Sequence, residues 1–155
     1  MIERFRASMA RLLAAVQSLS PAQRAAPVYR AWTVRELLVH IAAWDRALVP
    51  AIEAVLAGRQ PPFAGDREAA FNSRAIDESE GVPFDRAFAE MQAAHRALIA
   101  RMRQLTDEEW SRPTPHRWGN GTPMTVGSLF DYSYKGETHY GGHAKEIEAW
   151  RAGWR

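Results

Sequence analysis

The chain has 155 residues, a length that suits one domain with one hydrophobic core. Its 20 Lys and Arg residues are mixed with 18 Asp and Glu residues, which leaves a net charge of +2. This mixture lacks the basic block typical of a nucleic-acid-binding surface, so we expect no nucleic acid among the partners. The lack of cysteine excludes disulfides, thiolate zinc sites and cysteine nucleophiles. Any metal must therefore be bound by imidazole or oxygen ligands.

No stretch of the sequence stays apolar over the ~18 residues that a bilayer-spanning helix needs. The first residues, MIERFRASMARLLAAVQSL, carry charges throughout and lack the apolar centre and cleavage site of a signal peptide. We therefore expect a cytoplasmic protein without a membrane partner, folded as a single domain over residues 1–155.

The first half of the chain predicts two long helices. Apolar residues recur at helical spacing from about residue 2 to 19, and SPAQRAAP then predicts one short turn of helix. The second long helix starts in WTVRELLVHIAAWD, where Thr33 and Glu36 have the spacing of a capping box. It is expected to continue to about Ala57, with a kink at Pro50.

The second half predicts a shorter helix near REAAFNSRAIDES and a third long helix over about residues 84–105. A loop rich in Pro and Gly, SRPTPHRWGNGTPM, follows and is long enough to suggest a functional role. Thr125 is expected to cap the last helix, which continues to about Trp150. Because strand signals are few, the sequence predicts an all-α fold, a four-helix bundle with a short extra helix and one long loop before the last helix.

Two histidines in the stretch ETHYGGHAKEIEAW, His139 and His143, are spaced so that they lie about 40° apart on one helix face. That spacing lets two imidazoles share one metal ion, but a third ligand is needed. His40 lies at the edge of the apolar stripe of the second long helix, so it can face the pair from a packed neighbour. Three imidazoles would leave coordination positions open, as in catalytic zinc sites. The alternative is that all three are ordinary surface or core histidines.

Other side chains are candidates for a site near these histidines. Asp45 is a weak candidate for a general base or orienting group, although a helix cap or an ion pair with an arginine is favoured. Glu137 is a second weak catalytic candidate, and His95 is better explained as a hydrogen-bonded core histidine. The side chains expected to line a pocket are Trp44, Asn72, His95 and Tyr140.

Three segments together resemble the DinB superfamily, also called the DinB/YfiT-like four-helix bundles. WTVRELLVHIAAWD resembles the family's first metal segment, in which a Trp precedes a capped helix whose apolar run ends in His. ETHYGGHAKEI resembles its second, an HxxxH on the last helix. AFNSRAIDES resembles the Phe-Asn element of the branch that contains the ClbS/DfsB-type bundles. The order and spacing of the segments fit, and the likeness covers nearly the whole chain.

The resemblance implies a bundle that holds a divalent metal, most often zinc or nickel, through His40, His139 and His143. The superfamily includes thiol-dependent transferases, a mycothiol-dependent isomerase domain, a protein that hydrolyses a reactive cyclopropane, and many members without a known activity. It therefore implies a metal-dependent hydrolase or thiol S-transferase that acts on a small electrophilic molecule, with a low-molecular-weight thiol as a further partner. A non-catalytic small-molecule-binding or interaction protein of the same fold is the alternative. The exposed helix faces of a bundle also allow a homodimer.

Gly141 and Gly142, between the two histidines, depart from the family's pattern, because each glycine costs about 1 kcal/mol relative to alanine inside a helix. The pair either permits a close approach beside the metal or merely weakens the helix. Helical spacing places Gly141 at the edge of the apolar stripe and Gly142 away from it. Alanine is therefore expected to harm packing at Gly141 and to be tolerated at Gly142.

Overall fold

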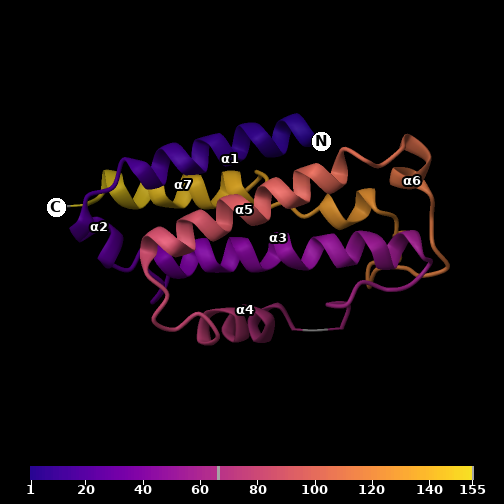
Figure 1. Cartoon of the computed structure of the whole chain (residues 1–155), viewed down its shortest axis with the longest axis horizontal. Coiled ribbons are helices and arrows are strands. Elements are labelled where there is room, and N and C mark those ends of the chain that lie inside the picture. The colour runs from indigo at the N-terminus through magenta and orange to yellow at the C-terminus, as the bar shows by residue number, and fades with distance from the viewer. Residues whose placement is uncertain (66, 155) are drawn as a thin grey trace.

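Four long helices form the body of the protein in the computed structural model, which describes residues 1–65 and 67–154. They are α1 (Ile2–Gln17), α3 (Val34–Leu56), α5 (Phe84–Met102) and α7 (His139–Ala152). α1 packs along α7 and α3 packs along α5. Figure 1 shows that α1 and α7 run in one direction and α3 and α5 in the other. The predicted all-α four-helix bundle is confirmed.

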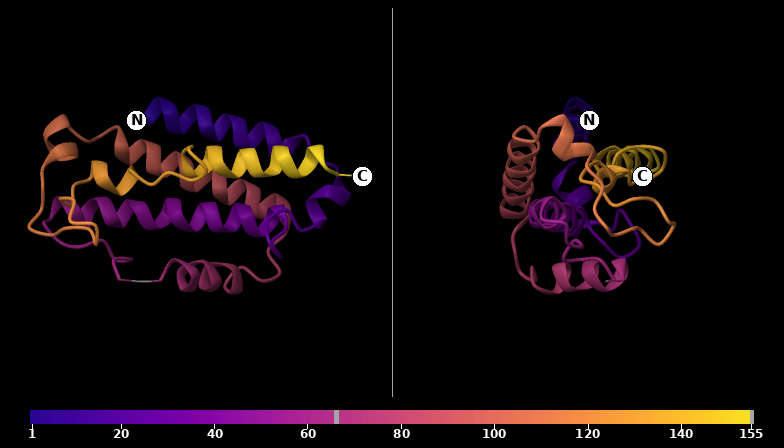
Figure 2. Two further views of the ribbon diagram at one scale, coloured as in Figure 1. Left: turned by 180° about the vertical axis from the view of Figure 1, so that it is seen from behind. Right: turned by 90° about the vertical axis from the view of Figure 1, so that its right-hand side faces the viewer.

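Three short helices connect or cover the long ones: α2 (Pro21–Ala25), α4 (Glu68–Asp77) and α6 (Asp107–Ser111). α4 lies outside the four-helix body, along α3, as the end-on view in Figure 2 shows. The predicted capping box is present at the start of α3. The Glu36 side chain accepts a hydrogen bond from the Thr33 backbone N–H, and the Thr33 side chain accepts one from a backbone N–H in the first turn of the helix. α3 then continues through Pro50 to Leu56 as one helix.

The core is built from apolar side chains at helical spacing on the inner faces of the long helices, and each contributes about 1.5–3 kcal/mol when fully buried. Completely buried members include Leu12, Val16, Leu37, Leu38, Ile41, Ile52, Met91, Leu98 and Ile147. None of the helices in the described part of the chain is long and apolar enough to cross a membrane.

The last helix begins later than the sequence predicted. Only one turn of 3-10 helix, η1 (Gly127–Phe130), follows Thr125, whose hydroxyl accepts a bond from the Ser128 backbone N–H at 3.0 Å. The chain then reverses direction before α7 begins at His139. The predicted continuous helix from Thr125 is wrong because Thr138 provides the cap of α7, accepting a bond from the Gly141 backbone N–H at 3.2 Å.

A tight turn from Tyr134 to Glu137 makes this reversal. The two end residues exchange backbone hydrogen bonds of 3.0 Å in each direction. Both central residues have positive φ, 53° at Lys135 and 78° at Gly136, as a type I′ hairpin turn requires. The turn folds Tyr134 back against the first two turns of α7, which carry the histidines of the HxxxH pair.

Candidate metal centre

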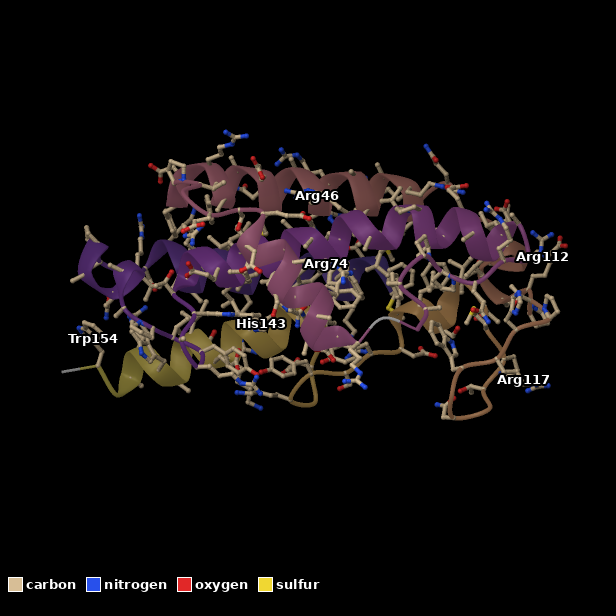
Figure 3. The ribbon with its side chains drawn as sticks, turned by 90° about the horizontal axis from the view of Figure 1, so that it is seen from below. Arg46, Arg74, Arg112, Arg117, His143 and Trp154 are labelled. Carbon is tan, nitrogen blue, oxygen red and sulfur yellow. The ribbon has the colours of Figure 1, made fainter. Side chains whose placement is uncertain are left out.

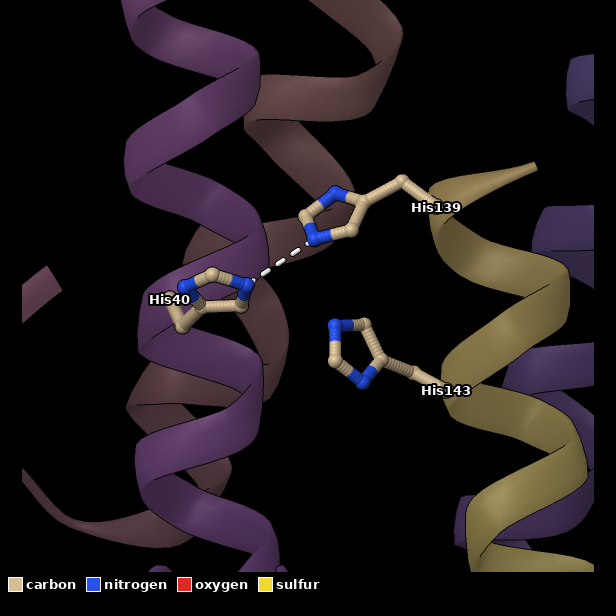
Figure 4. Close-up of side chains that lie close together, drawn as sticks. All are labelled: His40, His139 and His143. Atoms are coloured by element: carbon tan, nitrogen blue, oxygen red, sulfur yellow. Dashed lines mark hydrogen bonds between the residues drawn. The ribbon is translucent and has the colours of Figure 1, made fainter. Parts of the chain in front are cut away.

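Two helices bring three imidazoles together (Figure 4). His40 lies on the second turn of α3, and His139 and His143 lie on successive turns at the start of α7. The Nε2 atoms of His40 and His139 are 2.9 Å apart. One nitrogen from each histidine lies within 4.8 Å of the others, an arrangement that could hold a metal ion. His40 and His143 are buried, and His139 is partly exposed.

The side-chain amide of Asn72 fixes the tautomer of His40. The indole N–H of Trp44, which can only donate, lies 2.9 Å from Asn72 Oδ1 and so identifies that atom as the amide oxygen. His40 Nδ1 lies 3.0 Å from the same oxygen and must therefore donate to it. The proton on Nδ1 makes His40 Nε2 an acceptor, and in the metal-free protein its lone pair accepts a hydrogen bond from His139 Nε2.

A buried carboxylate fixes His143 in the same way. Glu146, one turn further along α7, accepts a bond from His143 Nδ1 at 2.9 Å. The Tyr134 hydroxyl donates to Glu146 at 2.5 Å, and the Lys135 ammonium lies 2.9 Å from the same carboxylate oxygen. His143 Nε2, at the other side of the ring, is buried and has no hydrogen-bond partner among the described residues.

This donor set fits a divalent cation. A buried acceptor without a donor costs about 1–3 kcal/mol, and a cation in front of the His143 Nε2 lone pair would remove that cost. Two nitrogens on one tetrahedral zinc ion lie ~3.3 Å apart when each is ~2.0–2.1 Å from the metal, close to the observed separation of His40 and His139. Hydrogen bonding of the opposite ring nitrogen to an amide or carboxylate oxygen is typical of histidines that bind metals.

The electrostatics favour neutral imidazoles, the form that binds a metal. Burial, together with the neighbouring His143, lowers the pKa of His40 to about 3. Burial and the two other histidines hold the pKa of His139 well below its ordinary value. Burial alone would raise the pKa of Glu146, but the hydrogen bonds from His143, Lys135 and Tyr134 outweigh it and place it at about 2.

Tyr134 approaches the helix backbone so closely at Gly142 that only glycine fits there. Helical spacing had predicted the opposite, that alanine would be tolerated at Gly142 and harmful at Gly141. A Cβ at Gly142 would lie 2.4 Å from the Tyr134 ring and 2.7 Å from the Tyr134 carbonyl oxygen. At Gly141 the nearest atom would be Glu137 Cβ at 3.0 Å, a tighter contact than most but one that a small shift relieves. The expectation was wrong because the turn at Tyr134, and not a longer α7, covers this face.

Asp45, Tyr140 and His95 form a separate buried cluster in the core. Asp45 is 1% exposed and accepts a bond from the Tyr140 hydroxyl at 2.6 Å, and burial raises the pKa of this carboxyl to about 7. His95 Nδ1 lies 3.1 Å from the same hydroxyl, so His95 is a hydrogen-bonded core histidine. The favoured arginine pair or helix cap for Asp45 is wrong, because the partner is a phenol. The polar ends of His95 and Tyr140 meet each other and Asp45 in the core, and not the three histidines, so a place for these two residues in a pocket stays a prediction.

Glu137 does not join the histidines either. Its carboxylate lies 3.6 Å from the Arg11 guanidinium of α1, which pairs more closely with Glu148 at 2.5 Å. The catalytic role considered for Glu137 is therefore not supported. Trp44 and Asn72, by contrast, both lie beside His40 through the contacts described above.

Glu146, Tyr134 and Lys135 were not among the predicted site residues. A contact between Glu146 and His143 could have been predicted from the sequence, because a residue three positions after a histidine shares its helix face. Tyr134 and Lys135 had none, since they reach Glu146 only through the turn before α7. Their role could be recognised only from the three-dimensional structure.

The depressed histidine pKa values predict acid sensitivity of the metal-free protein. The unfolded chain binds protons at His40, His95 and His139 below pH ~6.5 and the folded chain does not, so stability is lost as pH falls. Asp45 acts oppositely, because its raised pKa makes the folded form bind the extra proton. The net of about two protons corresponds to ~2.7 kcal/mol per pH unit once the histidines of the unfolded chain are protonated. Urea unfolding in a chelator should show the free energy of unfolding falling by about 3 kcal/mol from pH 6.5 to 5.0. A constant or rising value would contradict this balance.

The sequence profile of the DinB superfamily matches residues 4–147. The chain belongs to the DinB superfamily. Solved structures agree on the fold. The colibactin self-resistance protein ClbS, crystallised in complex with a dsDNA, superposes with a TM-score of 0.78 at 12% identity, covering 99% of this chain and 94% of ClbS. An uncharacterised protein from Escherichia coli UTI89 gives 0.74 at 14% identity, covering 96% of this chain and 89% of that one.

YfiT from Bacillus subtilis has a TM-score of 0.65 at 22% identity, covering 99% of this chain and 86% of YfiT. It is described as a probable metal-dependent hydrolase with an unusual four-helix bundle topology. At these identities the structural neighbours establish the fold alone. Their fold agrees with the predicted resemblance of this chain to DinB-like four-helix bundles.

The exclusion of nucleic acid from the partners was wrong. It rested on the absence of a basic block, yet the ClbS structure, with the same fold, contains dsDNA. A dispersed charge distribution is therefore no ground for excluding nucleic acid in this fold.

Part of this chain is similar in sequence to ATP synthase subunit b 1 of Maricaulis maris (strain MCS10), with 29% identity over 83 residues. The match covers 54% of this chain and 44% of that protein, so the chain spans less than half the length of this relative. It carries no argument about function here.

Proposed function

We propose that the protein is a metal-dependent hydrolase that acts on a small electrophilic molecule at a divalent ion, zinc or nickel, held by His40, His139 and His143. The observation that carries the proposal is the buried Nε2 of His143, which has a fixed lone pair, faces the two other histidines and lacks a hydrogen-bond partner among the described residues. YfiT, described as a probable metal-dependent hydrolase, supports the choice of reaction class.

The chemistry of the three ligands limits which metal ions the site can bind. Three neutral imidazoles suit zinc, nickel, copper or iron, whereas magnesium and calcium prefer oxygen ligands. An ion held by three protein ligands with an open position acts as a Lewis acid and makes water nucleophilic at neutral pH.

The chain's own residues orient the ligands. Asn72 holds His40 with Nε2 directed at the site, and Glu146 holds His143 likewise. Glu146 is buried, negatively charged and hydrogen-bonded to His143. Its charge also makes the His143 imidazole a stronger electron donor. Tyr134 and Lys135 satisfy the remaining oxygen of Glu146, so the carboxylate keeps one orientation.

The test uses tag-free protein, zinc-loaded or metal-free, with the electrophiles styrene oxide and p-nitrophenyl acetate in ¹⁸O-water, each with and without glutathione. If the protein is a hydrolase, turnover should require zinc and should place ¹⁸O in the product. This activity should be lost in His40→Gln. A glutathione adduct, the thioether from styrene oxide or the thioester formed from p-nitrophenyl acetate with loss of p-nitrophenolate, would make the protein a transferase instead. Equal rates in the zinc-loaded protein, the metal-free protein and His40→Gln would contradict catalysis at this site.

A further inference from the structure

Each of the three histidines packs against an aromatic ring from outside the helix pair. The Trp32 ring lies 5.3 Å from His40, the Tyr132 ring 6.2 Å from His139 and the Tyr134 ring 4.9 Å from His143, centroid to centroid. We call Trp32, Tyr132 and Tyr134 the aromatic rim. One aromatic ring per ligand histidine surrounds the candidate metal centre.

Two separate connecting segments supply the rim. Trp32 ends a tight turn in which Tyr29 and Trp32 exchange backbone bonds and Arg30 takes a positive φ of 52°. Tyr132 and Tyr134 belong to the segment between η1 and α7, which the turn at Lys135 folds back. Trp32 also packs against the hydrophobic core, whereas Tyr132 lies outside it with its side chain 56% exposed, so Tyr132 is not in place to complete the packing of the long helices.

The burial of the three histidines shows from which side the centre is reached. His40 and His143 are 5% and 3% exposed, whereas His139 is partly exposed. The ring beside His139 belongs to Tyr132, whose side chain is 56% exposed. A molecule that approaches the centre past His139 therefore meets the face or edge of Tyr132 first.

We infer that the aromatic rim selects a substrate that carries a planar aromatic or conjugated ring next to its electrophilic group, with Tyr132 as the stacking residue. The inference rests on the proposed function, because the metal centre fixes where the electrophilic group must lie. Aromatic pairs favour offset-stacked or edge-to-face contact and add attraction beyond the area they bury. An exposed tyrosine ring supplies that contact at little cost in conformational entropy, because its side chain has only two rotatable angles.

The test compares two metal-binding probes, benzohydroxamate and acetohydroxamate, by calorimetric titration into the zinc-loaded protein, after zinc binding itself has been measured. Both share the metal-binding group, and only the first carries a ring. We expect benzohydroxamate to bind about two- to twelve-fold more tightly, the range that an aromatic pair contributes. Tyr132→Ala should remove this preference and Tyr132→Phe should keep it.

Trp154→Ala is the matched control, because Trp154 is also an exposed aromatic residue, 42% exposed, but lies at the C-terminal end of the bundle away from His143 (Figure 3). It should leave the preference unchanged. Equal affinities for the two probes, binding of neither probe, or a preference that survives Tyr132→Ala would overturn the inference while zinc binding stands. Failure to bind zinc would instead overturn the proposed function.

Discussion

His143→Ala is expected to abolish stabilisation of the protein by zinc. A ligand that binds only the folded state stabilises it by ~2.7 kcal/mol when its free concentration is 100 times the dissociation constant. Losing one of three imidazoles leaves two, too few to hold the ion tightly. Urea unfolding with and without zinc at pH 7.5 should therefore show a large difference in the native chain and almost none in the variant.

The comparison must be made within each variant, because removing His143 also takes a partner from the buried Glu146 and lowers stability without any metal. His116→Ala is the matched control. Its Nδ1 lies 3.4 Å from the side-chain nitrogen of Gln60, and its neighbour Arg117 lies at the end of the molecule opposite to Trp154, apart from His143 (Figure 3). It should keep the full response to zinc. An unchanged response in His143→Ala would remove this histidine from the site.

Gly142→Ala is expected to destabilise the protein by about 3 kcal/mol or more, the upper end for an inserted methyl group in a packed site. The added carbon would meet both the ring and the backbone oxygen of Tyr134, and a backbone atom cannot move aside alone. Displacing Tyr134 also breaks its bond to Glu146 and loosens His143. Denaturant unfolding of the metal-free variant measures the first effect, and zinc titration measures the second.

Gly153→Ala provides the contrast within the same helix. Gly153 has a helical backbone conformation at the C-cap, and a Cβ there would meet only the Trp150 carbonyl oxygen at an ordinary 3.7 Å. Alanine at such a site is expected to be neutral or to stabilise by about 0.4–1 kcal/mol. If Gly142→Ala behaved like Gly153→Ala, the turn at Tyr134 would not be packed as described.

Local signals in the sequence were enough to predict most helices. The capping box at Thr33 and Glu36 marks the start of α3, and helical spacing places His139 and His143 on one face of α7. His40 could be added because an edge position on one helix faces an edge position on its packed neighbour. These signals depend on residues close together in the chain, which is why they could be read without a structure.

The rest depends on contacts between distant segments. Thr125 has the chemistry of a helix cap, but the helical turn that follows it ends at Phe130, and the left-handed pair Lys135 and Gly136, which carries no strong turn signal, then forms a tight turn before α7. Asp45 was expected to find an arginine because a buried carboxylate needs a donor, and the donor is Tyr140 on another helix. Composition and spacing could predict that Asp45 has a partner, but not which one.

The central claim is that one divalent ion is shared by the three imidazoles. Crystals of tag-free protein soaked in zinc at pH 7.5, with diffraction data collected above and below the zinc absorption edge, test it most directly. The account predicts one strong anomalous peak ~2.0–2.1 Å from the Nε2 atoms of His40, His139 and His143. Peaks only at other positions, or no peak between α3 and α7, would contradict it.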